Sequence, residues 1–251
     1  MTLGLAFAAV RSKDPAPIHR TRAGEVPMFR RLALCLLLAL PSAQAQLSNP
    51  ALSKSISNML NQLGSPAAPG AQAKPGTAGA VNLSFKPSAQ VRQKALTTFV
   101  EGFRGQSPEA ADQLAQAFKQ EDVFASIEGQ VKALYGLGIN DVADTWAVYW
   151  SYVWLLGQGK STDPTKPQVQ GLRQQFRAML GSLPEIASAS EARKQELADA
   201  MTLQLLLLSI VTETYRNEPE NLKAFAVPLS QQLGLDVTRL DLTDEGFRVK
   251  R

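Results

Sequence analysis

The chain has 251 residues, a formal net charge of +4, one cysteine and one histidine. Both of these side chains, Cys35 and His19, lie ahead of an expected cleavage site after Ala45. The rest of the chain therefore lacks the groups for a Ser-His-Asp or Cys-His nucleophilic site, a Cys/His zinc site, or haem ligation by His or Cys. We expect no cofactor and no metal ion in this protein.

Residues 28–45 have the pattern of a secretory signal peptide. A basic stretch, 28–31, precedes an apolar run, 32–40, and residues 41–45 end in an Ala-x-Ala form. This order is typical of a signal that is cleaved after Ala45. We therefore expect residues 1–27 to be an upstream mis-start, residues 28–45 a signal peptide, and the product to be periplasmic or extracellular.

The charge excess belongs to this leader. Residues 1–45 carry six Lys/Arg and two Asp/Glu, which leaves 20 basic and 20 acidic side chains in the other 206 residues. A neutral product gives no general electrostatic attraction to nucleic acid or to an anionic membrane, so we expect no nucleic-acid partner. The most apolar later stretch, Leu203–Val211, is far shorter than the ~20 residues that span a bilayer, so no integral membrane segment is expected after cleavage.

Two short segments precede the main domain. Apolar residues recur at helical spacing over residues 46–63, which predicts a short amphipathic helix. Residues 64–80 are rich in Pro, Gly and Ala without an apolar period, which predicts a flexible linker. We expect the loosely tethered helix to bind a partner or to dock on the chain's own domain. Its apolar positions are Leu52, Ile56, Met59, Leu60 and Leu63.

Residues 81–251 are predicted to form one all-α domain, a bundle of about six or seven helices. The tail from Arg239 alternates around Asp244-Glu245-Gly246, which fits either a small hairpin or an irregular end. Pro228 is expected to break or kink the last helix. The expected helices are Ser88–Arg104, Ser107–Phe118, Phe124–Tyr135, Asn140–Gly157, Val169–Gly181, Ser190–Asn217 and Asn217–Gly234.

The helix over residues 140–157 holds all three tryptophans, Trp146, Trp150 and Trp154, which are four residues apart and share one face. Asn140 suits the N-cap position, and Asp144 lies in the first turn, where a carboxylate complements the helix dipole. The aromatic face is either the core of the bundle or a platform for a sugar or another flat ligand. In the second interpretation the binding residues are Asp144, Trp146, Tyr149 and Trp150.

Carboxylates are the catalytic groups that remain without histidine or cysteine. Two Asp or Glu residues that flank a cleft can hydrolyse a glycan. The alternative interpretation is that these residues are helix starts and exposed helix positions, so no catalytic residue is assigned. The candidates are Glu101, Glu128, Asp141, Asp144 and Glu213.

The chain combines a signal peptide, a Pro/Gly/Ala linker and the aromatic segment from Leu137 to Trp154. In this combination it resembles uncharacterised bacterial secreted proteins that are helical and have no assigned function. The resemblance covers the domain from Val81 onward and implies an exported bacterial protein without a known activity. The residues themselves favour a non-enzymatic binding protein with an unknown protein or glycan partner. The alternative is a carboxylate-based glycan hydrolase or a lectin-like glycan binder that uses the aromatic helix.

Overall fold

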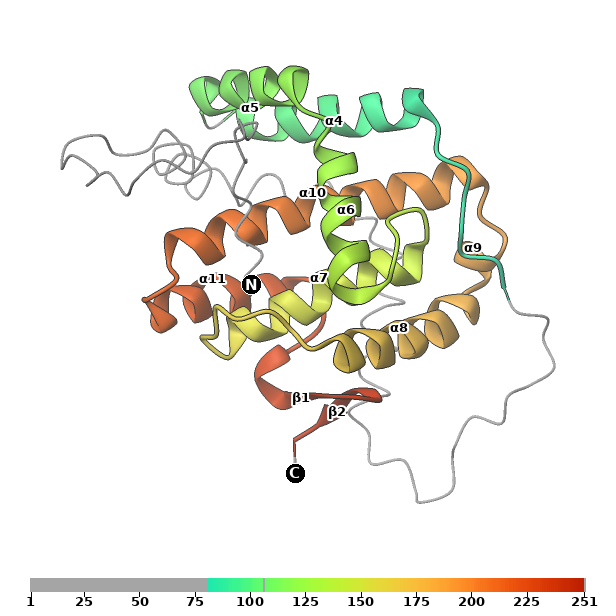
Figure 1. Cartoon of the computed structure of the whole chain (residues 1–251), viewed down its shortest axis with the longest axis vertical. Coiled ribbons are helices and arrows are strands. Elements are labelled where there is room, and N and C mark those ends of the chain that lie inside the picture. The colour runs from blue at the N-terminus through green and yellow to red at the C-terminus, as the bar shows by residue number, and fades with distance from the viewer. Residues whose placement is uncertain (1–80, 106, 251) are drawn as a thin grey trace, which may run out of the picture.

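The computed structural model describes residues 81–105 and 107–250. The predicted upstream extension, signal peptide, amphipathic helix and linker, all within residues 1–80, lie outside them. The described residues form a mostly helical bundle with a C-terminal hairpin, which confirms the expected fold class (Figure 1). The elements are α4 (Ala89–Arg104), α5 (Pro108–Gln120), α6 (Val123–Tyr135), α7 (Val142–Gly157), α8 (Lys166–Gly181), α9 (Pro184–Ala187), α10 (Glu191–Thr214), α11 (Pro219–Gln232), the 3-10 turn η2 (Val237–Arg239), β1 (Leu240–Thr243) and β2 (Gly246–Val249).

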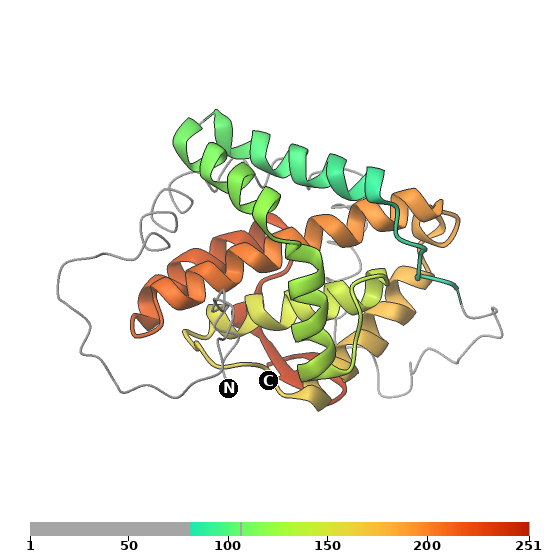
Figure 2. The ribbon, with the colours of Figure 1, turned by 45° about the horizontal axis from the view of Figure 1, so that its top comes forward.

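The long helix α10 lies between the α4–α5 pair and a lower group formed by α7, α8 and α11 (Figures 1 and 2). It packs against both α4 and α7, and α7 in turn contacts α8 and α11. Residues 205–208 of α10 are leucines that are all buried, because helices cover this segment on several sides. The longest helix therefore packs directly against the aromatic helix α7.

Helix starts follow the capping chemistry of the sequence. Ser88, Ser107 and Ser190 each accept a backbone N–H from the first turn of α4, α5 and α10, as predicted. Helix α6 ends at Gly136, which has a left-handed φ of 70°. Helix α10 ends at Thr214 rather than near Asn217, which makes it shorter than expected.

The prediction that Asn140 caps the aromatic helix is wrong, because Asp141 takes that position. The reason is tertiary. The carbonyl of Asn140 accepts the N–H of Phe85 at 3.0 Å, and the carbonyl of Leu83 accepts the N–H of Val142 at 3.1 Å. This extended pairing holds residue 140 outside the helix and leaves the next residue to cap it.

The expectation was a break or a kink at Pro228, and the helix does not break there, since α11 continues through it to Gln232. Three residues on one face of this helix, Leu222, Ala226 and Leu229, are at most 3% exposed. Their burial on both sides of the proline offsets the one backbone hydrogen bond that proline cannot donate.

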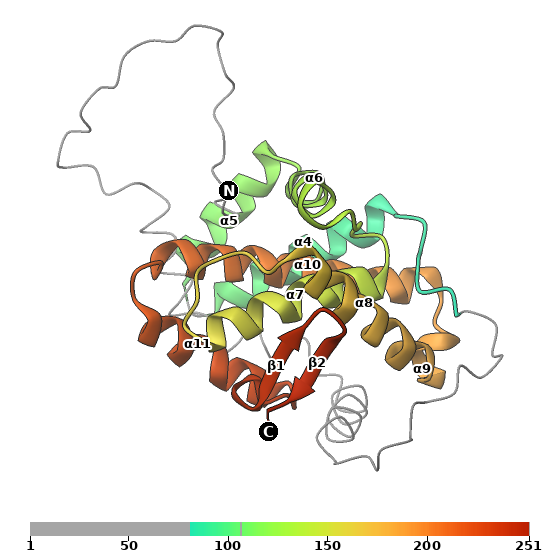
Figure 3. The ribbon, with the colours of Figure 1, turned by 60° about the horizontal axis from the view of Figure 1, so that its bottom comes forward.

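The tail forms the hairpin, antiparallel with Leu240 opposite Val249 and Thr243 opposite Gly246. It lies against α7 and α8 (Figure 3). The indole Nε1 of Trp154 donates to the Leu240 carbonyl at 2.7 Å, which ties the hairpin to the aromatic helix. The contact with the bundle explains why this short strand pair is ordered, since an isolated hairpin is marginal in water.

Helix α10 is, among the described residues, the one that is long and apolar enough to cross a membrane by length and composition alone. Within its apolar window 78% of the residues are buried inside the bundle. That degree of burial is typical of the core helix of a folded domain.

Candidate functional site

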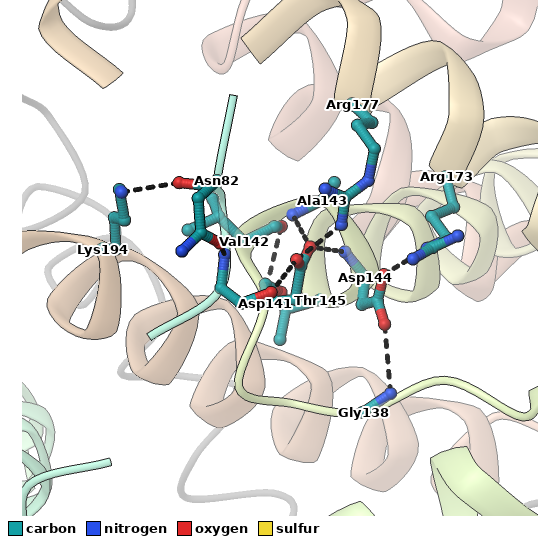
Figure 4. A network of polar contacts seen from close by, with 11 residues as sticks. Asn82, Gly138, Asp141, Val142, Ala143, Asp144, Thr145, Arg173, Arg177 and Lys194 are labelled. Carbon is teal, nitrogen blue, oxygen red and sulfur yellow. Dashed lines mark hydrogen bonds and ion pairs between the residues drawn. The ribbon is translucent and has the colours of Figure 1, made fainter. Parts of the chain in front are cut away.

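A buried polar network surrounds the first turn of the aromatic helix α7, where the sequence predicts a binding residue. Figure 4 shows Asp141 and Asp144 of α7 facing Arg177 and Arg173 of α8. The two aspartates are three residues apart and the two arginines four apart, so each pair lies on one face of its helix. The helices α7 and α8 pack together with these faces opposed.

Asp141 is the centre of the network. Its Oδ1 accepts the backbone N–H groups of Ala143 and Asp144 at 3.0 and 3.2 Å, which caps the helix. Its Oδ2 accepts the hydroxyl of Ser84 at 2.7 Å and Nη2 of Arg177 at 2.5 Å. One carboxylate therefore joins the start of α7, the extended segment before α4, and α8.

Asp144 is held by two donors of its own. Its Oδ1 accepts Nε of Arg173 at 2.5 Å, and its Oδ2 accepts the backbone N–H of Gly138 at 3.2 Å. The Asp144 side chain is 9% exposed. Both oxygens are thus committed to the fold, and a ligand would have to displace one of these donors to reach the carboxylate.

The surroundings separate the pKa values of the two carboxyls. Burial raises the pKa of Asp144 above its ordinary 3.8, the bond from Arg173 offsets only part of this, and the charge of Asp141 adds to the rise. Burial also acts to raise the pKa of Asp141, but the bonds from Ser84 and Arg177 outweigh it, so this pKa is lowered. Such a separation is found in acid–base sites and also in structural ion-pair networks. The arginine partners here favour the structural explanation.

A second set of buried contacts fixes the segment that leads into α4 on the first turns of α10. Nζ of Lys194 donates to the carbonyl of Asn82 at 2.6 Å. The Gln195 amide accepts the N–H of Ser88 at 2.8 Å and donates to the Ser88 carbonyl at 2.9 Å. Lys194 is 8% and Gln195 0% exposed, so these are satisfied buried groups that position the start of the domain.

Arg92 of α4 connects the two sets. Its Nη2 donates to the Asn140 side chain at 2.9 Å, and its Nε lies 3.7 Å from Oδ1 of the buried Asp199. Its guanidinium also lies over the ring of Phe124, 4.6 Å from the centroid. Arg92 thus holds α4, α6, α10 and the start of α7 together.

The predicted aromatic binding residues are inside the bundle. Trp146, Tyr149 and Trp150 are 2%, 0% and 2% exposed. Trp146 packs edge-on against Phe176 with ring centroids 5.9 Å apart, and Tyr149 packs edge-on against Trp150 at 5.5 Å. These contacts fit the core interpretation of the aromatic helix, because a stacking platform needs an exposed ring face.

Three polar atoms of this aromatic set have no hydrogen-bond partner among the described residues: Nε1 of Trp146, the hydroxyl of Tyr149 and Nε1 of Trp150. By contrast, the hydroxyl of Tyr152 donates to Asp163 at 2.7 Å and lies 2.9 Å from the hydroxyl of Tyr135. A buried donor without a partner costs about 1–3 kcal/mol. Removal of the polar atom at one of these three positions should therefore cost little stability.

The other candidate carboxylates are on separate helices. Glu101 pairs with Arg104 within α4, and Glu213 of α10 pairs with Arg216 just beyond the end of that helix. Glu128 of α6 is half-buried rather than exposed. Asp141 and Asp144 are the candidate pair that the fold brings into one network.

The surface is hollowed along both sides of α4. Toward α10 a shallow groove of about 240 Å³ is lined by residues of both helices. Toward α5 and α6 are two hollows of about 570 and 320 Å³, which share Leu96 and Phe118 and have charged side chains at their edges. The groove toward α10 is lined by Val91, Lys94, Ala95, Thr98, Phe99, Arg193, Glu196, Ala200, Leu203 and Gln204.

Sequence reasoning missed the basic partners of the network and this groove. Arg173 and Arg177 had a signal, since their four-residue spacing puts both on one face of a helix, as the three-residue spacing does for Asp141 and Asp144. Arg92 and Lys194 had none, because their partners are distant in sequence. The groove depends on how two helices cross, which no local pattern encodes.

Comparison with known proteins gives one match. The model of a family described as "Family of unknown function (DUF6683)" matches residues 30–250. Neither the search of curated proteins nor the search of solved structures finds a match.

Proposed function

The chain belongs to this family of unknown function. From its structure we propose that the protein is an exported, non-enzymatic binding protein, which holds an amphipathic helix in the groove between α4 and α10. The groove is the observation that carries the proposal. Its apolar lining comes from Val91, Ala95 and Phe99 on α4 and from Ala200 and Leu203 on α10. Charged residues lie at its edge, as at a helix-binding groove.

The size of the groove supports a helix rather than a small molecule. Its volume of about 240 Å³ is below the roughly 300–1,000 Å³ of typical small-molecule sites. A shallow apolar channel between two helices instead suits a row of side chains at positions i, i+3, i+4 and i+7 of a third helix. The ligand class is therefore an amphipathic helix with a narrow apolar face.

The polar network supports a binding role indirectly. Asp141 and Asp144 each hold an arginine at 2.5 Å, and their remaining acceptor sites bond to Ser84 and to backbone N–H groups. Bonds of this kind hold a scaffold rigid, and a rigid groove binds without the entropic cost of ordering.

The test places an environment-sensitive fluorophore in the groove. The full chain is expressed with Cys35→Ser and Thr98→Cys, where Thr98 is exposed at the groove edge. Titration with a synthetic Leu/Lys amphipathic helix should shift the emission to the blue and saturate. A scrambled peptide of the same composition, without an apolar face, should have no effect. The titration is repeated with Leu52→Ser, Ile56→Ser and Leu60→Ser, because the chain's own predicted helix would compete.

The matched control carries the fluorophore at Gln231→Cys, an exposed position of α11. Helix α11 packs on α7 and η2, away from the groove. No response at this site is expected. If the amphipathic peptide gives no saturable shift at position 98 in either background, the proposed function is wrong.

The second candidate is a glycan hydrolase or lectin-like glycan binder centred on Asp144 and the aromatic helix. The opposite pKa shifts of Asp141 and Asp144 favour it. It requires the aromatic face of α7 to open, since Trp146, Tyr149 and Trp150 are buried. Turnover of glycan fragments that Asp144→Asn abolishes without loss of folding would establish this alternative.

A further inference from the structure

We infer that the helix held in the α4–α10 groove is the chain's own segment 47–63, which folds back on the domain. This inference rests on the proposed function and names its ligand. Three observations carry it: the place where the described chain begins, the length of the preceding linker, and the apolar pattern of the segment.

The described chain begins below the N-terminal ends of α4 and α10, where Val81 lies beside Gly181 of α8 and Leu83 pairs with the start of α7. Helices α4 and α10 run in the same direction in both views, with their N-terminal ends together (Figures 1 and 2). Lys194 binds the carbonyl of Asn82 at that end. The residue before it, Arg193, lines the groove. The linker therefore starts on the same side of the bundle as the N-terminal ends of the two helices that line the groove, and the segment 81–88 separates it from α4.

The length of the linker allows the segment to reach the groove. Residues 64–80 are 17 residues, of which 4 are Gly, 3 are Pro and 6 are Ala. A Gly-rich chain of that length has a root-mean-square span of about 23 Å, and the prolines extend this linker further. The groove residues of α10 run from Arg193 to Gln204, about 17 Å at 1.5 Å per residue. A fully extended linker of 17 residues reaches about 56 Å, and a short flexible tether that reaches its site gives an effective concentration of order millimolar. A shallow groove with weak intrinsic affinity would thus be occupied.

The segment fits the groove in shape and charge. In the helix that the sequence predicts, its apolar side chains at 52, 56, 59, 60 and 63 would share one face. Its only charged residue is Lys54, on the opposite side. The acid at the groove edge, Glu196, already pairs with Lys94 and Arg193. Apolar contact would therefore hold the segment, and docking should be insensitive to salt.

Cysteine pairs test this assignment. The full chain with Cys35→Ser is expressed so that the cell's processing decides the N-terminus, and Met59→Cys is combined with Thr98→Cys. Under mild oxidation of a dilute sample, an intramolecular disulfide should form, visible on a non-reducing gel and by intact mass. The rate should not change between low and high salt.

Two matched pairs serve as controls. Asn61→Cys with Thr98→Cys moves the thiol two residues along, to the other side of the predicted helix. Met59→Cys with Gln231→Cys keeps the segment thiol and moves its target to α11. Both pairs should react at least about tenfold more slowly. Every pair shares the effective concentration that the tether provides, but docking holds only the first pair of thiols in contact. Adding Leu52→Ser, Ile56→Ser and Leu60→Ser to the first pair should remove its advantage.

Each outcome separates the two proposals. Equal rates for all pairs, together with a saturable peptide response at position 98, would overturn the self-docking inference and leave the groove as a site for another protein's helix. Equal rates without a peptide response would overturn both. A disulfide between two chains would assign the groove to the segment of a second copy.

Discussion

Arg177 of α8 reaches the carboxylate that caps α7, with its Nη2 2.5 Å from Oδ2 of Asp141. A second pair repeats the arrangement: Arg173, one turn earlier in α8, donates to Asp144, which is three residues after Asp141. The two pairs are chemically alike, but the surroundings shift the pKa of the two aspartates in opposite directions.

This difference predicts unequal costs of neutralisation. At pH 7 we expect Asp141→Asn to lower the free energy of unfolding by about 2 kcal/mol, because it removes charge-assisted bonds from Arg177 and Ser84 while asparagine still caps the helix. We expect Asp144→Asn to change it by less than about 1 kcal/mol, because burial already opposes the ionised form. Urea unfolding measures both, with Asp112→Asn, an exposed partner of Arg104, as control. A larger loss at Asp144 would contradict this order.

The difference in free energy of unfolding between the parent and each variant should also change with pH in opposite directions. The stability that Asp141 contributes is complete above its unfolded pKa, near 3.9, and is lost as pH falls through its lower folded pKa. The gap between the parent and Asp141→Asn should therefore narrow below about pH 4. The folded pKa of Asp144 is raised, so its contribution is complete below the unfolded pKa and is lost as pH rises. The free energy of unfolding of Asp144→Asn should therefore rise relative to that of the parent as pH increases above about 4. Urea unfolding at a series of pH values measures this.

Removal of an orphaned hydroxyl should be tolerated. We expect Tyr149→Phe to leave stability unchanged or raise it by about 1 kcal/mol, because the Tyr149 hydroxyl is buried without a partner in the described residues. Tyr152→Phe, the matched change, removes the bonds to Tyr135 and Asp163 and should cost about 1–2 kcal/mol. Thermal unfolding compares them. A clear loss in Tyr149→Phe would reveal a buried water or ligand on that hydroxyl.

The hairpin depends on one glycine of α8. A Cβ on Gly171 would lie 2.0 Å from the carbonyl oxygen of Asp244 in the hairpin turn. Gly171→Ala should therefore destabilise the fold by about 3 kcal/mol, because backbone has to move. Gly129→Ala in α6, where a Cβ meets nothing within 4 Å, should instead stabilise by about 0.5–1 kcal/mol. Similar unfolding midpoints for the two variants would show that the hairpin turn does not pack closely against Gly171 of α8.

Tryptophan emission tests the buried position of the aromatic helix. Trp146 and Trp150 are 2% exposed and Trp154 is 8% exposed, so the emission should be blue-shifted and insensitive to iodide. Glycan fragments should leave the spectrum unchanged. Quenchable emission that shifts with a glycan would move the site to the aromatic helix and support the hydrolase or lectin-like alternative.

The sequence by itself determined the helices and most of their ends. Periodic apolar residues place α4–α8, α10 and α11, and capping serines and glycines fix their limits within a few residues. These features are local, because a cap acts within one turn and an amphipathic face repeats every 3.6 residues. The aromatic helix is visible for the same reason.

Only the tertiary structure decided which elements those apolar faces pack against. Pairing with the extended segment around Ser84 makes Asp141, rather than Asn140, the N-cap of α7. Burial of one face of α11 allows that helix to continue through Pro228. The partners of Asp144 and Lys194 lie 29 and 112 residues away. Such contacts, like the groove along α4, depend on how whole helices pack, and a periodic pattern states only that a face is apolar, not what covers it.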